Sequence, residues 1–290
     1  MRKLNTSFLC FFLFIASLQA QKDIAVASVR YTFTHINDTT QPENPNKENT
    51  ILYLGKNMSN YTNFDRAELI RTTGSPFGRV MMSKNGGPQT PVEMPPLSPE
   101  KLNEWSSIGN YFKDFGNSKI FYIANPGGKL TAIEESMPTI NWVITQDIKE
   151  IMGLPCQKAT ADFKGRTYEA WFSSQLPYSN GPWKLGGLPG LIIEASDTKK
   201  EVIFKMVSFE NANDTQVAIE IPPAATKTSP KEYKQYQEAL EKDRQAMIGS
   251  SSVSGGMAVS GRLTASTLTL DGKPVKPKQM NNPIEKETKK

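Results

Sequence analysis

Hydrophobic and polar residues alternate along the first part of the chain that follows the N-terminal segment. Between residues 24 and 36, Val29, Tyr31 and Phe33 occupy every second position, and polar residues stand between them. A period of two predicts a β-strand with one buried face. His35 lies at the end of this strand on the apolar parity, and we interpret it as a partly buried structural residue.

Short apolar segments of the same kind recur along the chain, separated by turn signals such as Lys164-Gly165. Closely spaced strands without βαβ alternation favour an antiparallel meander. We therefore predict a mainly β protein of the α+β type, built on a curved antiparallel sheet or half-barrel with one or two helices. The further strands are predicted at 51–54, 119–124, 130–134, 141–145, 158–163, 166–173, 191–195 and 202–209.

Proline, glycine and charged residues mark where the sheet is interrupted. Residues 37–49 are predicted to form a polar loop, and the proline-rich stretch at 86–99 a longer one. Ser98-Pro99 is typical of a helix start. An exposed helix is predicted within residues 226–248 from its apolar spacing. Residues 249–290 are rich in Ser, Gly and Lys, which predicts a disordered basic tail.

The N-terminus has the composition of a secretory signal peptide. Two cationic residues precede an apolar run at 8–18, and small residues follow it, so we expect cleavage after residue 20 and a signal peptide over residues 1–20. The run is shorter than the roughly 20 residues that span a bilayer. The remaining β-rich domain, 21–225, contains a single cysteine, Cys156. Export without disulfides favours a periplasmic, outer-membrane-associated or extracellular bacterial protein.

The charge of the chain excludes some partners. The formal net charge is +5, but the excess lies in the N-terminal segment and in the tail, and the body between them is close to neutral. A neutral body argues against a nucleic-acid-binding platform. No later segment is long and apolar enough to predict a membrane span.

Few residues offer catalytic chemistry, because the chain after residue 20 has one histidine and one cysteine. No paired histidines, Cys-x-x-Cys motif or spaced carboxylates indicate a metal site, and no phosphate-binding loop indicates a nucleotide. The sequence therefore predicts no metal and no cofactor. Asp162 and Glu169, which lie near aromatic residues, leave open a hydrolase that uses carboxylates. Cys156 leaves open a redox or metal-handling role.

The most distinctive segment is rich in glycine and proline and covers residues 180–192. Leu188-Pro189-Gly190-Leu191 suits a type II turn, with glycine at the position that needs a positive φ. Gly181-Pro182 predicts a second bend, and Gly186-Gly187 a bulge or close backbone approach. We interpret this segment as a tight connection between core strands.

This segment resembles the GLPGLI family of secreted proteins from Gram-negative bacteria, which is named after the hexapeptide at 187–192. Ordered matches extend over residues 142–195. The resemblance implies export, a β-rich domain and no known catalytic residue, and the arrangement is similar to the half-barrels of lipoprotein carriers, an analogy of fold alone. The residues that match the family motif are Cys156, Gly165, Arg166, Gly181, Pro182, Gly187, Leu188, Pro189, Gly190, Leu191 and Ile192.

Together these features favour a non-enzymatic envelope protein that binds an apolar ligand or a partner protein. Aromatic residues on the predicted strands supply the apolar surface, and Trp171 and Trp183 are the candidate binding residues. The alternatives are the hydrolase based on Asp162 and Glu169 and the redox role of Cys156. An open pocket on the sheet face would support ligand binding. A filled sheet face without a pocket would mean that the aromatic residues only build the core.

Overall fold

The computed structural model describes residues 22–73, 109–125, 129–211, 217–250, 269–270, 273–274 and 280–286. The expected signal peptide at 1–20 and the helix expected to start at Ser98-Pro99 lie outside the described residues. Most of the expected disordered tail also lies outside them.

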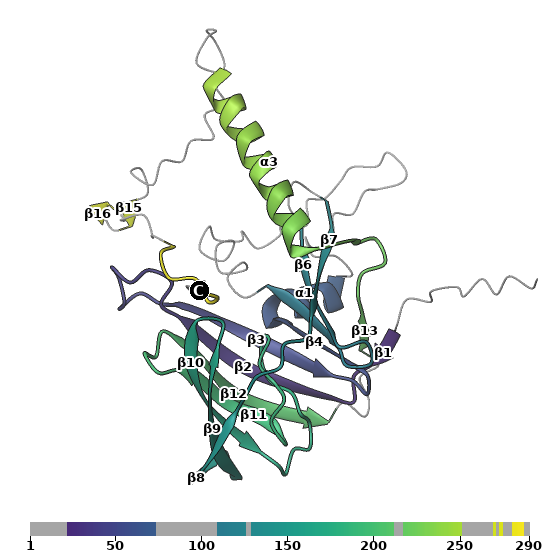
Figure 1. The fold of residues 1–290 in the computed structure, drawn as a ribbon, viewed down its shortest axis with the longest axis vertical. Helices are drawn as coiled ribbons and strands as arrows, with labels where there is room; N and C mark the ends of the chain where they lie inside the picture. Colours follow the sequence, from purple (N-terminus) through teal and green to yellow (C-terminus); the bar gives the residue numbers. More distant parts are fainter. Residues whose placement is uncertain are drawn as a thin grey trace, which may run out of the picture.

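Twelve strands form one large sheet in which neighbours are antiparallel except for one pair (Figure 1). The strands are β2 (Ala27–His35), β3 (Asn46–Leu54), β4 (Met58–Asn63), β5 (Asn110–Asp114), β6 (Lys119–Ala124), β7 (Thr131–Ser136), β8 (Val143–Ile151), β9 (Leu154–Phe163), β10 (Arg166–Ser173), β11 (Leu191–Asp197), β12 (Val202–Asn211) and β14 (Thr226–Thr228). Their order is β14-β7-β6-β5-β4-β3-β2-β12-β11-β10-β9-β8. The sheet is curved and does not close, so the predicted class, mainly β with an antiparallel sheet, is confirmed.

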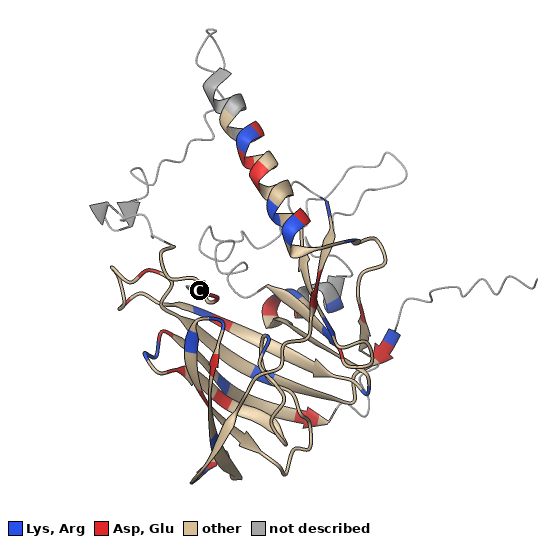
Figure 2. Ribbon diagram, in the orientation of Figure 1, with Lys and Arg blue, Asp and Glu red and all other residues tan. Residues whose placement is uncertain are grey.

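Smaller elements border this sheet. Strands β1 (Lys22–Ile24) and β13 (Ala218–Glu220) pair with each other, as do β15 (Thr269–Leu270) and β16 (Lys273–Pro274). Helix α1 (Phe64–Thr73) follows β4, and helix α3 (Pro230–Ser250) projects from the sheet with both signs of charge along it (Figure 2). Ser229 caps α3 reciprocally, because its hydroxyl accepts from the Glu232 N–H while the Glu232 carboxylate accepts from the Ser229 N–H.

The sequence pattern succeeds where one strand face is buried. In β2 the buried positions alternate with more exposed ones, as predicted. The turns Lys164-Gly165 and Met152-Gly153 have positive φ at both residues, which is the geometry of two-residue β-hairpins.

The structure differs from the predictions where that alternation is absent. β3 begins at Asn46, inside the expected loop 37–49, and β4 and β5 were not predicted. The helix predicted within residues 226–248 is present as α3, which starts at Pro230, and only the preceding residues 226–228 differ, because they form β14. β8 extends well beyond the expected strand at 141–145. It carries no buried face, so no alternation of apolar and polar residues marks its full length in the sequence.

The main hydrophobic core lies on one face of the sheet, and a loop fills it. Phe33, Tyr31 and Phe204 of the central strands pack in one cluster with Trp183 and Leu188, which belong to the connection between β10 and β11. A second, smaller cluster lies where β5 and β6 meet β1 and β13. Because the β10–β11 connection occupies the interior face, that face is not an open half-barrel cavity.

Candidate functional site

Hydrogen bonds to its backbone close the connection between β10 and β11. Asn180 and Gly186 form an isolated antiparallel bridge. The Ile192 N–H donates to the Asn180 carbonyl at 3.0 Å, and the Trp142 indole N–H donates to the Gly186 carbonyl at 2.9 Å. These bonds hold residues 180–187 against the sheet, and we call this segment the motif loop.

The end of this connection differs from the expected type II turn. The Gly190 N–H donates to the Leu188 carbonyl at 2.8 Å, which closes a three-residue turn at Pro189. A Cβ on Gly190 would lie 2.2 Å from the Ser173 carbonyl oxygen. Glycine is therefore required here because two backbones approach closely.

Lys113 on β5 holds the two arms of the motif loop together. Its buried ammonium donates hydrogen bonds to the Asn180 side-chain oxygen at 2.8 Å, to the Gly181 carbonyl at 2.9 Å and to the Leu185 carbonyl at 2.5 Å. These bonds use all three N–H donors of the ammonium. Lys113 thus links a distant strand to the glycine-rich motif.

No carboxylate pairs with the Lys113 ammonium in the part of the chain that the structure describes. Burial therefore acts without compensation and lowers the pKa of Lys113 to about 7. A buried cation without an opposite charge produces a positive potential in the space beside it.

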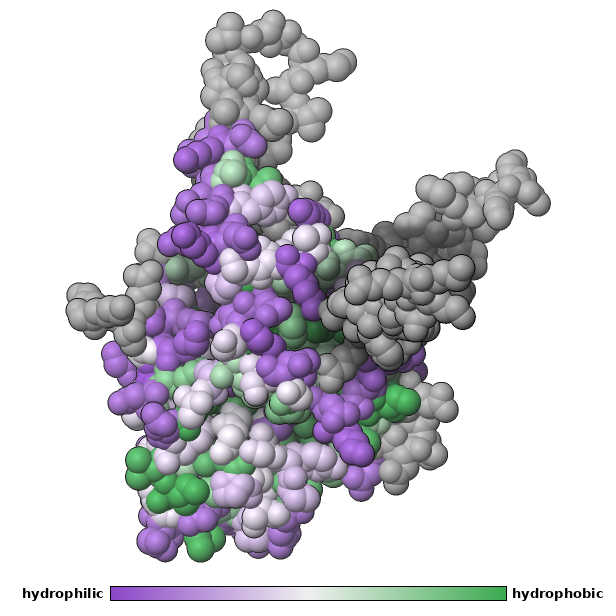
Figure 3. Space-filling model, turned by 45° about the vertical axis from the view of Figure 1, so that its right-hand side comes forward, coloured by the Kyte–Doolittle hydropathy of each residue, from purple (hydrophilic) through white to green (hydrophobic). Residues whose placement is uncertain are grey.

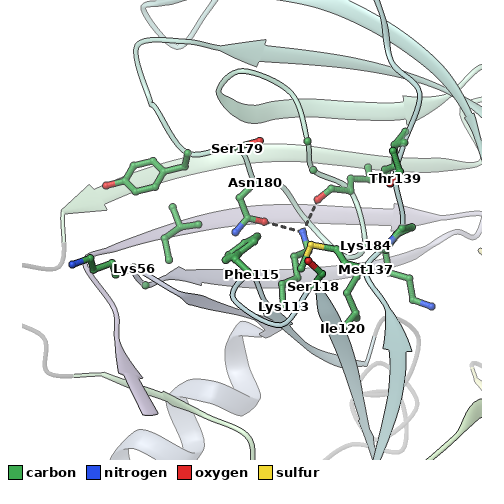
Figure 4. Close-up of a pocket in the computed structure, with 18 of the residues that line it drawn as sticks. Lys56, Lys113, Phe115, Ser118, Ile120, Met137, Thr139, Ser179, Asn180 and Lys184 are labelled. Atoms are coloured by element: carbon green, nitrogen blue, oxygen red, sulfur yellow. Dashed lines mark hydrogen bonds between the residues drawn. The ribbon is translucent and has the colours of Figure 1, made fainter. Parts of the chain in front are cut away.

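That space is a cleft of about 630 Å³ (Figure 4). Apolar side chains such as Phe115, Ile120 and Ile140 line part of it, and Lys56, Lys113 and Lys184 are its only charged lining residues in the described chain. The remaining lining residues are Leu54, Gly55, Ser118, Met137, Pro138, Thr139, Pro177, Tyr178, Ser179, Asn180, Leu185, Gly186 and Gly187. The cleft therefore combines apolar walls with positive charge.

Lys184 is paired with two carboxylates that lie outside the lining. Its ammonium lies 2.9 Å from the Glu135 carboxylate and 2.7 Å from that of Glu285. It also lies 5.7 Å from the centre of the Tyr111 ring. Lys56 is exposed, and no ion pair involves it among the described residues. Lys56 and Lys113 are therefore the lysines whose charge acts on the cleft without a carboxylate partner.

The structure separates the two tryptophans predicted to bind a ligand. Trp183 has no exposed surface and packs against Phe163 and Tyr168. Trp183 is therefore a core residue. It has no exposed surface for a ligand, contrary to the prediction that it contacts one. Trp171 is partly exposed on the other face of the sheet, where the Lys149 ammonium lies 4.4 Å from its ring centre. Neither tryptophan lines the cleft.

The residues of the alternative chemistries lie outside the cleft. Asp162 accepts a hydrogen bond from Thr167 at 2.5 Å, and Glu169 lies between Lys158 and Lys200 at 3.3 and 3.6 Å. Cys156 is buried, and burial raises the pKa of its thiol. His35 is buried, and burial lowers its pKa to about 4. Their surroundings favour neither hydrolytic nor thiol chemistry.

Arg166 is the centre of a second polar cluster, which part of the expected disordered tail completes. Its guanidinium lies 2.7 Å from Asp197 and 2.8 Å from Glu201. It also donates to Asn282, Pro283 and Ile284 at 2.7, 2.8 and 3.1 Å. Residues 280–286 are therefore packed on the sheet, and the tail prediction is corrected for this segment.

Gly165 also serves this segment. A Cβ on Gly165 would lie 2.7 Å from the carbonyl oxygen of Lys286, and the Lys286 N–H donates to the Lys164 carbonyl at 2.9 Å. Two residues of the predicted family motif, Gly165 and Arg166, thus form the surface on which residues 280–286 lie. Composition alone predicted disorder, because it does not show that single polar side chains such as Asn282 are buried.

One family of known proteins matches the part of the chain that contains the motif loop. Residues 162–194 match the family described as "Protein of unknown function (Porph_ging)". The Porph_ging match runs from the end of β9 to β11 and contains the motif loop and the hexapeptide at 187–192. It is consistent with the GLPGLI resemblance, and it assigns no activity.

Comparisons of whole proteins add little. No curated protein matches the chain. Two solved structures, titled as PNGF-II in P21 and C2 space groups, are similar at TM-scores of 0.46 and 0.44, with 13% and 12% identity over 74% of this chain. The chain spans about a third of their length, 33% and 32%.

Proposed function

We propose that the protein is a non-enzymatic binding module that takes a small amphipathic anion into the cleft beside the motif loop. The observation that carries the proposal is the lining of the cleft: apolar walls, no carboxylate among the lining residues, and two lysines, Lys56 and Lys113, that have no carboxylate partner in the described chain. A volume of about 630 Å³ lies within the range of roughly 300–1,000 Å³ usual for small-molecule sites. We also propose that the protein is exported, on the evidence of the signal-like residues 1–20.

The chemistry of the walls defines the ligand class. Phe115, Ile120 and Ile140 offer apolar contact for a hydrocarbon chain. The uncompensated ammonium of Lys113 favours a carboxylate or another anionic group nearby. The ligand need not displace the three hydrogen bonds of Lys113, because the charge acts through space. Among the described residues, no helix is both long and apolar enough to cross a membrane, and no cluster of His, Cys, Asp and Glu suits a metal ion.

Binding of dodecanoate by the full chain, measured by isothermal titration calorimetry, tests this proposal. We expect dodecanoate to bind, and acetate and dodecyltrimethylammonium not to bind, because each lacks one half of the required chemistry. Lys56→Glu and Phe115→Ser are each expected to weaken binding about three- to tenfold. Lys200→Glu, an exposed change outside the cleft, is the matched control and is expected to have no effect. Equal binding of the cationic detergent would refute the proposal.

The affinity is also expected to depend on pH. The pKa of Lys113 is about 7 without ligand, and a bound anion raises it. Binding above pH 7 therefore takes up a proton, and the affinity falls by up to about tenfold per pH unit as pH rises above 7. Titrations in two buffers with different ionisation enthalpies measure the proton uptake. Lys113→Met should abolish the uptake, and an affinity that is the same at pH 6 and pH 9 would contradict this role of Lys113.

A further inference from the structure

Strand β8 (Val143–Ile151) ends the large sheet with an unpaired edge. It pairs with β9 on one side, regularly from Ile148 to Ile151 and with a register shift between Ile144 and Ile148, and no described strand lies on its other side (Figure 1). An unpaired edge presents a row of free backbone N–H and C=O groups that another strand can bond. With nine residues, β8 is long for an edge strand.

This edge also exposes apolar side chains. Val143, Ile144 and Ile148 are 65%, 43% and 71% exposed, and Met152 in the adjoining turn is 56% exposed. Apolar surface gathers at the lower end of the molecule in Figure 3, the end at which Figure 1 places β8. A long, unpaired edge that exposes apolar side chains is a site at which sheets associate.

The pairing with β9 fixes which backbone groups face outward. The two-residue turn after Ile151 makes Ile151 and Leu154 a hydrogen-bonded pair. Hydrogen-bonded and non-hydrogen-bonded pairs alternate, and Glu150 faces Pro155, which has no N–H to donate. It follows that Ile148, two residues further, directs its N–H and C=O to the open edge.

Charge selects the partner and the register. If two β8 strands pair antiparallel about a twofold axis at Ile148, each Asp147 faces Lys149 of the other copy. Axes at Asp147, Lys149 or Glu150 would instead place each of these residues opposite its own copy, and like charges directly opposite one another are unfavourable. The axis at Ile148 also brings Ile148, the most exposed apolar residue of β8, against its own copy. β8 is therefore complementary to itself.

We propose that two copies of this chain associate through β8, antiparallel about an axis at Ile148, to form one continuous sheet. Lys149 already lies 2.9 Å from Glu194, and Asp147 accepts a hydrogen bond from Thr145 at 3.2 Å. Asp147 of the second copy joins Lys149 as a second acceptor. The proposal is independent of ligand binding in the cleft.

Sedimentation equilibrium of the full chain tests the proposal, because Ile148 meets its own copy. We expect the wild type to dimerise, and Ile148→Lys and Ile148→Glu to weaken dimerisation at least about tenfold each through like-charge contact. An equimolar mixture of the two variants should dimerise again, because Lys then faces Glu. Val207→Lys, at an exposed apolar position on β12, is the control and should remain dimeric. A monomeric wild type, unaffected variants or a mixture that stays monomeric would overturn the proposal.

Discussion

Arg166→Met is expected to lower the free energy of unfolding by about 3–5 kcal/mol, because it removes one partner of a buried ion pair. The Arg166 side chain is 2% exposed, and its five N–H donors serve Asp197, Glu201 and residues 282–284. Urea unfolding followed by circular dichroism measures the loss. Hydrogen exchange of residues 280–286 should rise in the same variant, since the segment loses its main donor.

A second variant and the pH dependence of stability provide controls for this prediction. Arg166→Lys keeps the charge but has three donors in place of five, so it should recover only part of the loss. Burial alone would raise the pKa of Glu201. Hydrogen bonds from Arg166, Asn282 and Lys286 outweigh that effect and lower this pKa to about 2. Its contribution is present above its usual pKa of 4.5 and is lost as pH falls toward 2. This acid sensitivity should shrink in Arg166→Met, and an unchanged profile would show that the cluster is not coupled.

Gly190→Ala is expected to destabilise the protein by at least about 4 kcal/mol, or to prevent folding. The added methyl group would lie 2.2 Å from the Ser173 carbonyl oxygen and 2.6 Å from its carbon. The backbones of β10 and the β10–β11 connection would have to separate, because neither atom belongs to a flexible side chain.

Gly187→Ala provides a matched control in the same motif. Gly187 has a φ of +86°, but a Cβ added there meets nothing within 4 Å. Its cost is therefore only that of the backbone conformation, about 1–2 kcal/mol. Thermal unfolding of both variants measures the difference, and equal losses would mean that the close approach at Ser173 is not what requires glycine.

Sequence reasoning succeeded where a local rule decides the structure. The alternation in β2 and the Lys164-Gly165 turn each follow from a few neighbouring residues. β4 was missed because five of its six residues are buried, so no alternation marks it. The approximate place of the motif was predicted, but the exact geometry of the Pro189 turn was not.

The candidate site could not be predicted from local patterns. Lys113 reads as an ordinary charged residue in the segment Tyr111-Phe112-Lys113-Asp114. Its contacts with Asn180 and Leu185 span 67 and 72 residues. The only signal in the sequence is a lysine on the same strand parity as the aromatic Tyr111, and that signal is too weak to select it without the strand order.

The bonds of Asn282 have a consequence for the order in which the protein folds. Its side chain donates to the Ile36 carbonyl, which lies 246 residues earlier in the chain. Contacts between such distant positions form slowly, because a long stretch of chain must be ordered before they are made. During synthesis the Arg166 cluster lacks three of its acceptors until residues 282–284 have emerged. This buried cluster is therefore completed only after nearly all of the chain has been made.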